Sequence, residues 1–174
     1  MKKPPAKPIA VYAGSFDPLT VGHMWMIEAG VRLFGQLTVA IGVNPAKHST
    51  FTLEERLEML RASTKQLRGV RATSFGNQYL IDYARDIGAT HILRGIRSPS
   101  DFEFERVMRN INGDLDAAVT TVFLMPPRDI AEVSSSMVRG LIGPKGWRRV
   151  VRQYVPVAVY SRLIAIYHGR SKRT

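Results

Sequence analysis

Short apolar runs rich in β-branched residues alternate with amphipathic stretches along most of this chain. The short runs are typical of buried strands, and the stretches between them have the three- and four-residue apolar spacing of helices. Strands that alternate with helices form βαβ units, in which helices cover both faces of a parallel sheet. The pattern therefore predicts an α/β fold with a five-stranded, mostly parallel sheet. The expected strands cover residues 9–13, 37–43, 70–75, 91–93 and 120–125.

Helical patterns fill the intervals between these strands and the C-terminal end. Thr52 precedes Glu55 by three residues, which is the spacing of a capping box, and Ser134 can cap the helix that follows it. Ser100 has the same capping chemistry for the helix after it. The last 30 residues have a helical pattern with a break before Pro156. The expected helices before that end cover residues 24–34, 52–62, 79–87, 101–112 and 134–142.

The length of 174 residues suits one domain of ordinary size. We expect residues 1–174 to form a single domain, in which residues 1–7 are flexible and residues 143–174 form a basic helical extension and tail. The absence of cysteine excludes disulfides, thiolate metal sites and cysteine nucleophiles. No apolar run approaches the ~20 residues that a membrane span requires. We therefore expect a cytoplasmic protein with no membrane partner.

The formal net charge of +11 is concentrated at the C-terminal end, because residues 133–174 contain nine lysines and arginines and no aspartate or glutamate. Such an end could bind nucleic acid or an anionic membrane surface. Alternatively, it could be a solvated helical face beside a site for polyanionic small molecules. Its aromatic residues are not interleaved with the charges as a single-strand binding platform requires. We therefore favour the second alternative and expect no nucleic-acid partner.

The turn after the first expected strand reads Gly14-Ser-Phe-Asp-Pro-Leu-Thr-Val-Gly-His23. Parallel sheets bind ligands at the carboxyl ends of their strands, so this turn is a candidate site. Gly22 and His23 fall at the opening of the next helix, where free backbone N–H groups and the helix dipole favour an anion. A histidine there can donate to a phosphate oxygen. A lone Gly-His pair, however, is more often a surface histidine at a helix start.

Cationic and hydroxyl side chains follow other strands. Lys47 comes after the second strand, and Arg94 and Arg97 come after the fourth, so all three should point into one crevice. Most lysines and arginines are solvated surface charges, but clustering at strand ends favours a phosphate site. The run Ser134-Ser-Ser136 offers hydroxyls and backbone N–H groups to a triphosphate, although simple capping would need only one serine.

Glu105 and Asn112 are seven residues apart, so they share one face of a helix. Two structural alternatives stay open for them. Glu105 could be an ordinary member of a charged helix face, and Asn112 could be a helix C-cap ahead of Gly113.

The loop of residues 14–23 resembles the His/Thr-x-Gly-His signature of the nucleotidylyltransferase superfamily, here Thr20-Val-Gly-His23. With the preceding Gly-Ser-Phe-Asp-Pro, it is most similar to the phosphopantetheine adenylyltransferase family. The resemblance covers about residues 8–142, but the segment Asp129-Ile-Ala-Glu132 departs from the aromatic-Ser-Phe-type run of the family. Further motifs recur in order: Asn44-Pro-Ala-Lys47, Phe51-Thr-Leu-Glu-Glu-Arg56, Arg94-Gly-Ile-Arg97, Asp101-Phe-Glu-Phe-Glu105, Val122-Phe-Leu-Met-Pro126 and Val133-Ser-Ser-Ser136.

The resemblance implies a Rossmann-like nucleotidylyltransferase fold with a helical C-terminal end. It also implies adenylyl transfer from ATP to 4′-phosphopantetheine, which yields dephospho-coenzyme A and pyrophosphate in coenzyme A synthesis. Mg²⁺ would accompany the nucleotide and be held by phosphate oxygens and water, with no metal-binding residue of the protein. The family further implies a homo-oligomer, a hexamer, and feedback by coenzyme A.

By the same resemblance, His23 stabilises the transition state, Thr20 supports it, and Lys47 and Arg94 orient the attacking phosphate. The positions that match contacts to 4′-phosphopantetheine are Ser15, Lys47, Leu80 and Arg94. The positions that match contacts to ATP are Ser15, Phe16, His23, Gly95, Ile96, Arg97, Glu105, Ile130, Ala131, Glu132, Val133, Ser134, Ser135 and Ser136.

Two alternatives to this function stay open. The chain could transfer a nucleotidyl group to another phosphomonoester, such as nicotinate mononucleotide. It could also be a non-catalytic RNA- or phosphate-binding module, although a pure binder would not need Thr20, His23, Lys47 and Arg94 together.

Overall fold

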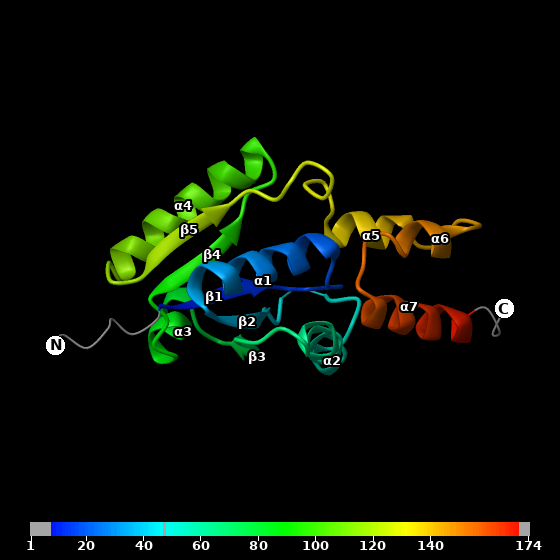
Figure 1. Cartoon of the computed structure of the whole chain (residues 1–174), viewed down its shortest axis with the longest axis horizontal. Coiled ribbons are helices and arrows are strands. Elements are labelled where there is room, and N and C mark those ends of the chain that lie inside the picture. Colours follow the sequence, from blue (N-terminus) through cyan, green and yellow to red (C-terminus); the bar gives the residue numbers. More distant parts are fainter. Residues whose placement is uncertain (1–7, 47, 171–174) are drawn as a thin grey trace.

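The structure, a computed structural model, describes residues 8–46 and 48–170, with side chains as far as residue 167. Figure 1 shows the strands gathered in one sheet, with helices against it and a helical C-terminal end to one side. In chain order the elements are β1 (Ile9–Gly14), α1 (Val21–Phe34), β2 (Gln36–Val43), α2 (Leu53–Thr64), β3 (Val70–Gly76), α3 (Leu80–Asp86), β4 (His91–Gly95), α4 (Pro99–Leu115), β5 (Thr120–Leu124), α5 (Ser135–Leu141), α6 (Trp147–Val151) and α7 (Val157–Arg170).

The five strands are all parallel and lie in the order β3-β2-β1-β4-β5. The predicted α/β sheet is therefore confirmed. Strands β2 and β3 lie on one side of β1, and β4 and β5 lie on the other, so the order reverses between β1 and β4. Open parallel sheets bind ligands outside the carboxyl ends of the strands at such a reversal. The two strands are in register there, with Tyr12 opposite Leu93.

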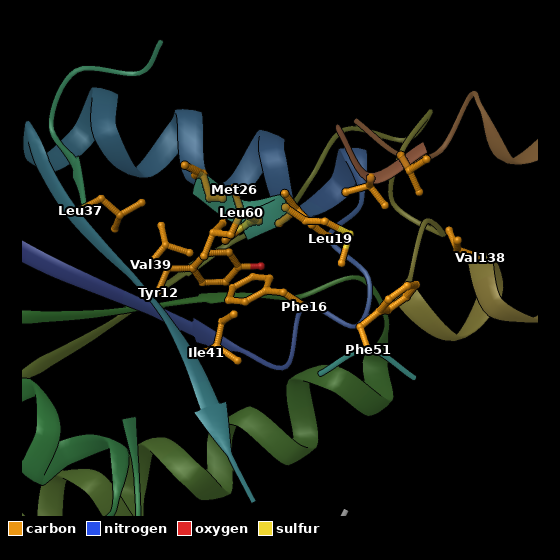
Figure 2. Close-up of a cluster of buried hydrophobic side chains, with 14 of the residues drawn as sticks. Tyr12, Phe16, Leu19, Met26, Leu37, Val39, Ile41, Phe51, Leu60 and Val138 are labelled. Atoms are coloured by element: carbon orange, nitrogen blue, oxygen red, sulfur yellow. The ribbon is translucent and has the colours of Figure 1, made fainter. Parts of the chain in front are cut away.

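Buried side chains form a layer on each face of the sheet, because neighbouring residues of a strand point to opposite faces. Figure 2 shows part of the larger layer, in which Tyr12 of β1 lies with Met26 of α1 and Leu60 of α2. The smaller layer contains Val11 of β1 and Ile81 of α3. The prediction of helices on both faces is thus confirmed.

The C-terminal helices are part of the larger core. Val159 and Leu163 of α7 are buried in it, and Arg162 donates from its terminal nitrogen to Glu55 of α2 at 2.6 Å. The predicted break before Pro156 separates α6 from α7. Within the described ranges, no helix is both long and apolar enough to cross a membrane. Residues 1–7, which were predicted to be flexible, lie outside the described residues, as do residues 171–174 of the predicted helical extension and tail.

Helix caps explain where most helices begin. The predicted caps Thr52 and Ser134 each accept a backbone N–H three residues later, so both predictions are confirmed. The first helix was expected from residue 24, but it begins at Val21 because Thr20 caps it. The side chain of Thr20 thereby satisfies one of the backbone donors that a helix start leaves free.

The longest helix, α4, also begins earlier than predicted. Its cap is Ser98 and not Ser100, since the Ser98 hydroxyl accepts the Asp101 N–H at 3.2 Å. Pro99 fits the first turn because a proline has no N–H that would need a partner there. The helix continues to Leu115, three residues beyond the expected end.

The loop between β1 and α1 is tied to two other segments by Asp17. Its two carboxylate oxygens accept the backbone N–H groups of Thr50 at 2.8 Å and Phe51 at 3.0 Å. The Asp17 side chain is almost fully buried, so water does not replace these bonds. Arg139 of α5 donates to the Asp17 carbonyl oxygen. Asp17 thus stabilises the loop by accepting two backbone N–H bonds.

We predict that Asp17→Ala lowers the free energy of unfolding by about 3 kcal/mol, because two N–H groups lose a charged acceptor. Urea unfolding of both proteins would measure the difference. The matched control is Asp116→Ala, which removes a 2.9 Å bond to the Ala118 N–H in an exposed loop. The control should cost less than about 1 kcal/mol. Equal losses in the two variants would contradict the structural role of Asp17.

Candidate active site

A polar cavity of about 250 Å³, here called the first cavity, lies at the carboxyl ends of β1 and β4. Part of its wall comes from these two strands, the loop after β1 and the start of α1. The rest comes from α4 with the segment that leads to it, and from the segment between β5 and α5. Gly22 lets this last segment approach α1, because a Cβ there would lie 3.1 Å from the carbonyl oxygen of Val133.

His23 lines the first cavity and also belongs to the N-terminal cap of α1. The Thr20 hydroxyl oxygen accepts the His23 N–H at 3.3 Å, and His23 Nδ1 accepts the Thr20 N–H at 3.1 Å. The Thr20 hydroxyl also lies 3.0 Å from Nδ1. Because Nδ1 accepts a backbone N–H, we assign the ring proton to Nε2. The imidazole therefore retains one N–H donor that the cap does not use.

Burial, together with the positive charge of Arg97, lowers the pKa of His23 to about 4. At neutral pH the ring is thus an uncharged donor. The Phe16 ring lies edge-on to it, with centroids 5.1 Å apart. Phe16 was expected to contact ATP, but its side chain is 1% exposed and belongs to the core under His23.

Two arginines at the end of β4 are each held by a carboxylate of α4. Arg94 donates from Nε to Glu105 at 2.8 Å and from a terminal nitrogen to the second oxygen of that carboxylate. Arg97 donates from Nε to Asp101 at 2.8 Å. This bond is the main reason that the pKa of Asp101 is lowered and that of Arg97 is raised.

Sequence reasoning missed both pairs. Arg94 and Glu105 are eleven residues apart, so only the packing of α4 beside β4 brings them together. Glu105 is therefore no ordinary member of a charged surface face, because it is buried against Arg94. The available signal was the four-residue spacing of Asp101 and Glu105, which places both carboxylates on one side of a helix.

A second cavity of about 670 Å³ adjoins the first. The two share Ser15, Arg94 and Glu105, and the second extends along α4 to Phe104, Met108 and Leu115 and across to Leu80 of α3. Its walls are largely apolar side chains. Leu80 was predicted to line the arm of the pantetheine substrate, and it does lie in this cavity wall.

Asn112 also lines the second cavity. The alternative that it is a helix C-cap is wrong, since α4 continues through it to Leu115. Its side chain is 9% exposed, whereas those of Phe104 and Ile111 on the same helix are 60% and 45% exposed. The helix thus contributes both buried polar residues and more exposed apolar residues to the wall of the second cavity.

The serines of α5 are engaged by the protein. Ser134 caps the helix, the Ser135 hydroxyl donates to the Pro18 carbonyl at 2.8 Å, and the Ser136 hydroxyl accepts from Arg139 at 3.1 Å. The Ser135 bond attaches α5 to the loop after β1, whereas the bonds of Ser134 and Ser136 are to residues of α5 itself. None of the three serines lines the first cavity.

The other predicted positions divide into three groups. Ile96, Ala131 and Glu132 are described but do not line the first cavity, and the Ile96 N–H donates to the Leu124 carbonyl at 2.9 Å. Lys47 lies outside the described residues. The predicted ATP positions that do line the cavity are Ser15, His23, Gly95, Arg97, Glu105, Ile130 and Val133.

Tyr12 is a wall residue that sequence reasoning did not identify. Burial raises the pKa of its hydroxyl to about 12, and the charges of Arg94 and Arg97 oppose the shift. The hydroxyl therefore stays protonated at neutral pH and is a donor at the first cavity. Its position near the end of a strand was the only signal in the sequence.

Within the part of the chain that the structure describes, no three His, Cys, Asp or Glu side chains are grouped to hold a metal. The two carboxylates at the first cavity, those of Asp101 and Glu105, are already paired with arginines. A divalent cation at this site would therefore depend on oxygens that a ligand brings.

Comparison with known proteins gives one consistent family. A family model described as cytidylyltransferase-like matches residues 11–141. The phosphopantetheine adenylyltransferase of Chromobacterium violaceum is 56% identical over 91% of this chain and 96% of its own length. The enzyme of the same name from Heliobacterium modesticaldum is 42% identical over 91% of this chain and 92% of its own length.

Solved structures share the fold at low sequence identity. A putative nicotinate-nucleotide adenylyltransferase from Vibrio parahaemolyticus matches with a TM-score of 0.65 at 19% identity, over 92% of this chain and 93% of its own. A Plasmodium falciparum nicotinic acid mononucleotide adenylyltransferase complexed with APC matches with a TM-score of 0.67 at 15% identity, over 94% and 96% of the two chains. These likenesses confirm the predicted nucleotidylyltransferase fold.

We predict that the His23 imidazole stays neutral from pH 8 to about pH 5 and takes up a proton only near its pKa of about 4. In the unfolded chain the same ring protonates near pH 6.5. The unfolded state therefore binds more protons between these values, and the free energy of unfolding falls as pH falls through this window. NMR titration of the ring would measure the pKa directly. His23→Gln should remove this part of the pH dependence, and a measured pKa near 6.5 would contradict the prediction.

Proposed function

This chain belongs to the phosphopantetheine adenylyltransferase family of cytidylyltransferase-like proteins, and we propose that it transfers the adenylyl group of ATP to 4′-phosphopantetheine. The products are dephospho-coenzyme A and pyrophosphate. The observation that carries the proposal is the meeting of two unlike cavities at Ser15, Arg94 and Glu105. One is small and polar and contains His23, and the other is long and largely apolar.

The reaction needs no covalent enzyme intermediate. A phosphate oxygen of 4′-phosphopantetheine attacks the α-phosphorus of ATP, and the bond from that phosphorus to the bridging oxygen of pyrophosphate breaks. Catalysis then consists of placing the reactants in line and stabilising charge on the phosphoryl oxygens. The Nε2–H of His23 suits this role because it is a neutral, preorientated donor, and Thr20 supports it by holding Nδ1.

The acceptor occupies the second cavity in this proposal. Its apolar walls, which include Leu80, suit the pantetheine arm, and the phosphate lies where the two cavities meet. Ser15 and Arg94 would bind that phosphate together with Lys47.

The nucleotide occupies the first cavity and its rim. Gly95, Arg97, Ile130 and Val133 contact it directly in this proposal, as do Ser15 and His23, whereas Glu105 lines the same cavity with its carboxylate paired to Arg94. The remaining positions that the family resemblance assigns to ATP do not line this cavity in the structure: Phe16, Ile96, Ala131, Glu132, Ser134, Ser135 and Ser136. The nucleotide enters as its Mg²⁺ complex, with the metal held by phosphate oxygens and water, because the nearby carboxylates are paired with arginines.

A different phosphomonoester is the second candidate acceptor, since the structures with the same fold include nicotinate-nucleotide and nicotinic acid mononucleotide adenylyltransferases. The apolar character of the second cavity favours the pantetheine arm over a second nucleotide.

Assembly into a homo-oligomer, a hexamer by family, is part of the proposal. A set of exposed apolar side chains on α4 supports it, because side chains so exposed are usually covered in an assembly. The set contains Phe102, Phe104, Val107, Ile111 and Leu115, of which Phe104, Ile111 and Leu115 also line the second cavity. Feedback by coenzyme A is expected from the family, and a cytoplasmic location is expected from the composition.

The proposal is tested by offering ATP and Mg²⁺ with a panel of phosphomonoesters and measuring pyrophosphate release. The panel contains 4′-phosphopantetheine, nicotinate mononucleotide and glycerol 3-phosphate. We expect turnover with 4′-phosphopantetheine to exceed that with the others by at least about 100-fold, because only its arm fills the apolar cavity. Preference for nicotinate mononucleotide would replace the proposal with the second candidate.

We predict that His23→Ala lowers kcat by about 100-fold or more, since one directed donor to the transition state is lost. Much of the ATP binding should remain, and the protein should still fold, with about 1 kcal/mol less free energy of unfolding because the Thr20 N–H loses its acceptor. Steady-state kinetics, calorimetric ATP binding and thermal unfolding of the variant would check the three expectations. Equal turnover in wild type and variant would reject the role of His23.

A further inference from the structure

The Arg94 side chain forms part of the wall between the two cavities and is exposed to both. It is the arginine that the proposed function places against the phosphate of the acceptor. A long flexible side chain in such a position would lose conformational freedom on binding, unless another group already held it. The contacts of Arg94 therefore show which residues hold its guanidinium in place before the acceptor phosphate binds.

Three bonds hold the guanidinium. Nε and one terminal nitrogen donate to the two oxygens of Glu105, and the other terminal nitrogen donates to the Ala13 carbonyl at 2.9 Å. The Glu105 side chain is only 9% exposed, whereas that of Arg94 is 25% exposed. The carboxylate is thus mostly removed from solvent, and the guanidinium keeps an open edge.

A guanidinium carries five N–H groups in one plane. Glu105 and Ala13 take three of them, so two remain without a partner among the residues that the structure describes. Two N–H groups fixed in a plane match two oxygens of a phosphate. The orientation of that open edge depends on Glu105, because the bidentate bond sets the rotation of the guanidinium plane.

We infer that Glu105 is a positioning residue for Arg94, and that it determines the affinity for the acceptor phosphate through this arginine. The inference rests on the proposed function, in which Arg94 binds that phosphate. It assigns to Glu105 an effect on the acceptor, which differs from the direct ATP contact that family resemblance implies for this position.

The neighbouring pair provides an internal comparison. Asp101 lies one helical turn before Glu105 on α4 and holds Arg97 by a bond of 2.8 Å to Nε. Arg97 lines only the first cavity. Loss of the Asp101 carboxylate should therefore act on the nucleotide, whereas loss of the Glu105 carboxylate should act on the acceptor.

The test compares Glu105→Gln with Asp101→Asn and with a matched control, Glu103→Gln. Glu103 lies on the same helix and pairs with Arg106 at 3.0 Å on the exposed face. We expect Glu105→Gln to raise the KM for 4′-phosphopantetheine about tenfold or more and to change the KM for ATP less than about twofold. Asp101→Asn should show the reverse pattern, and the control should change neither KM.

A double variant separates positioning from a general structural effect. In an Arg94→Lys background, Glu105→Gln should add no further increase in the KM for 4′-phosphopantetheine, because the group that it positions is gone. Effects that multiply in the double variant would overturn the inference. So would a rise in the KM for ATP as large as that for the acceptor. If Glu105→Gln does not fold, Glu105→Asp should give the same selective change with smaller size.

Failure of the proposed function can be distinguished from failure of this inference. Calorimetry would measure binding of 4′-phosphopantetheine to wild type and to Glu105→Gln without turnover. If wild type binds it but does not transfer the adenylyl group, the function is wrong, and the ratio of the two Kd values still decides the role of Glu105. Absence of binding to wild type would overturn both.

Discussion

The start of α1 and the chemistry of the first cavity depend on one reciprocal contact, between Thr20 and His23. A helix leaves its first backbone N–H groups without partners. Here the Thr20 hydroxyl accepts the N–H of His23, and Nδ1 of His23 accepts the N–H of Thr20. The same contact decides which ring nitrogen carries the proton. A glutamate could complete the cap equally well, but it would leave no N–H donor at the cavity, whereas the imidazole does. The same His23 side chain therefore both caps α1 and supplies the N–H donor at the cavity.

The polar cavity relies on directed donors more than on uncompensated positive charge. Arg94 and Arg97 are each balanced by a carboxylate of α4, and burial keeps His23 and Tyr12 neutral. Fixed donors in a site with little water stabilise developing charge without having to reorganise. Part of the negative charge of a bound nucleotide would then be neutralised by the cation that accompanies it, because the arginines of the cavity are already paired.

Most of the fold could be predicted from sequence, because strand runs and cap residues are local signals. The caps Thr52 and Ser134 were found, whereas α4 was placed two residues late since Ser98 and Ser100 offer the same chemistry. The pair of Arg94 and Glu105 depends on tertiary packing, so no local pattern reveals it. The single-domain organisation and the roles of the site residues stay predictions.

The basic C-terminal end is explained in part by contacts within it. The guanidinium of Arg148 lies 5.8 Å from the centre of the Trp147 ring, and that of Arg152 lies 6.0 Å from the centre of the Tyr160 ring. Trp147 also packs edge-on against Tyr167. These rings take part in helix packing and cation–π contacts, and they do not form the row of stacking platforms that single-strand binding needs. The arrangement favours a solvated basic face that lies beyond the carboxyl edge of the sheet, where its field would attract polyanionic substrates.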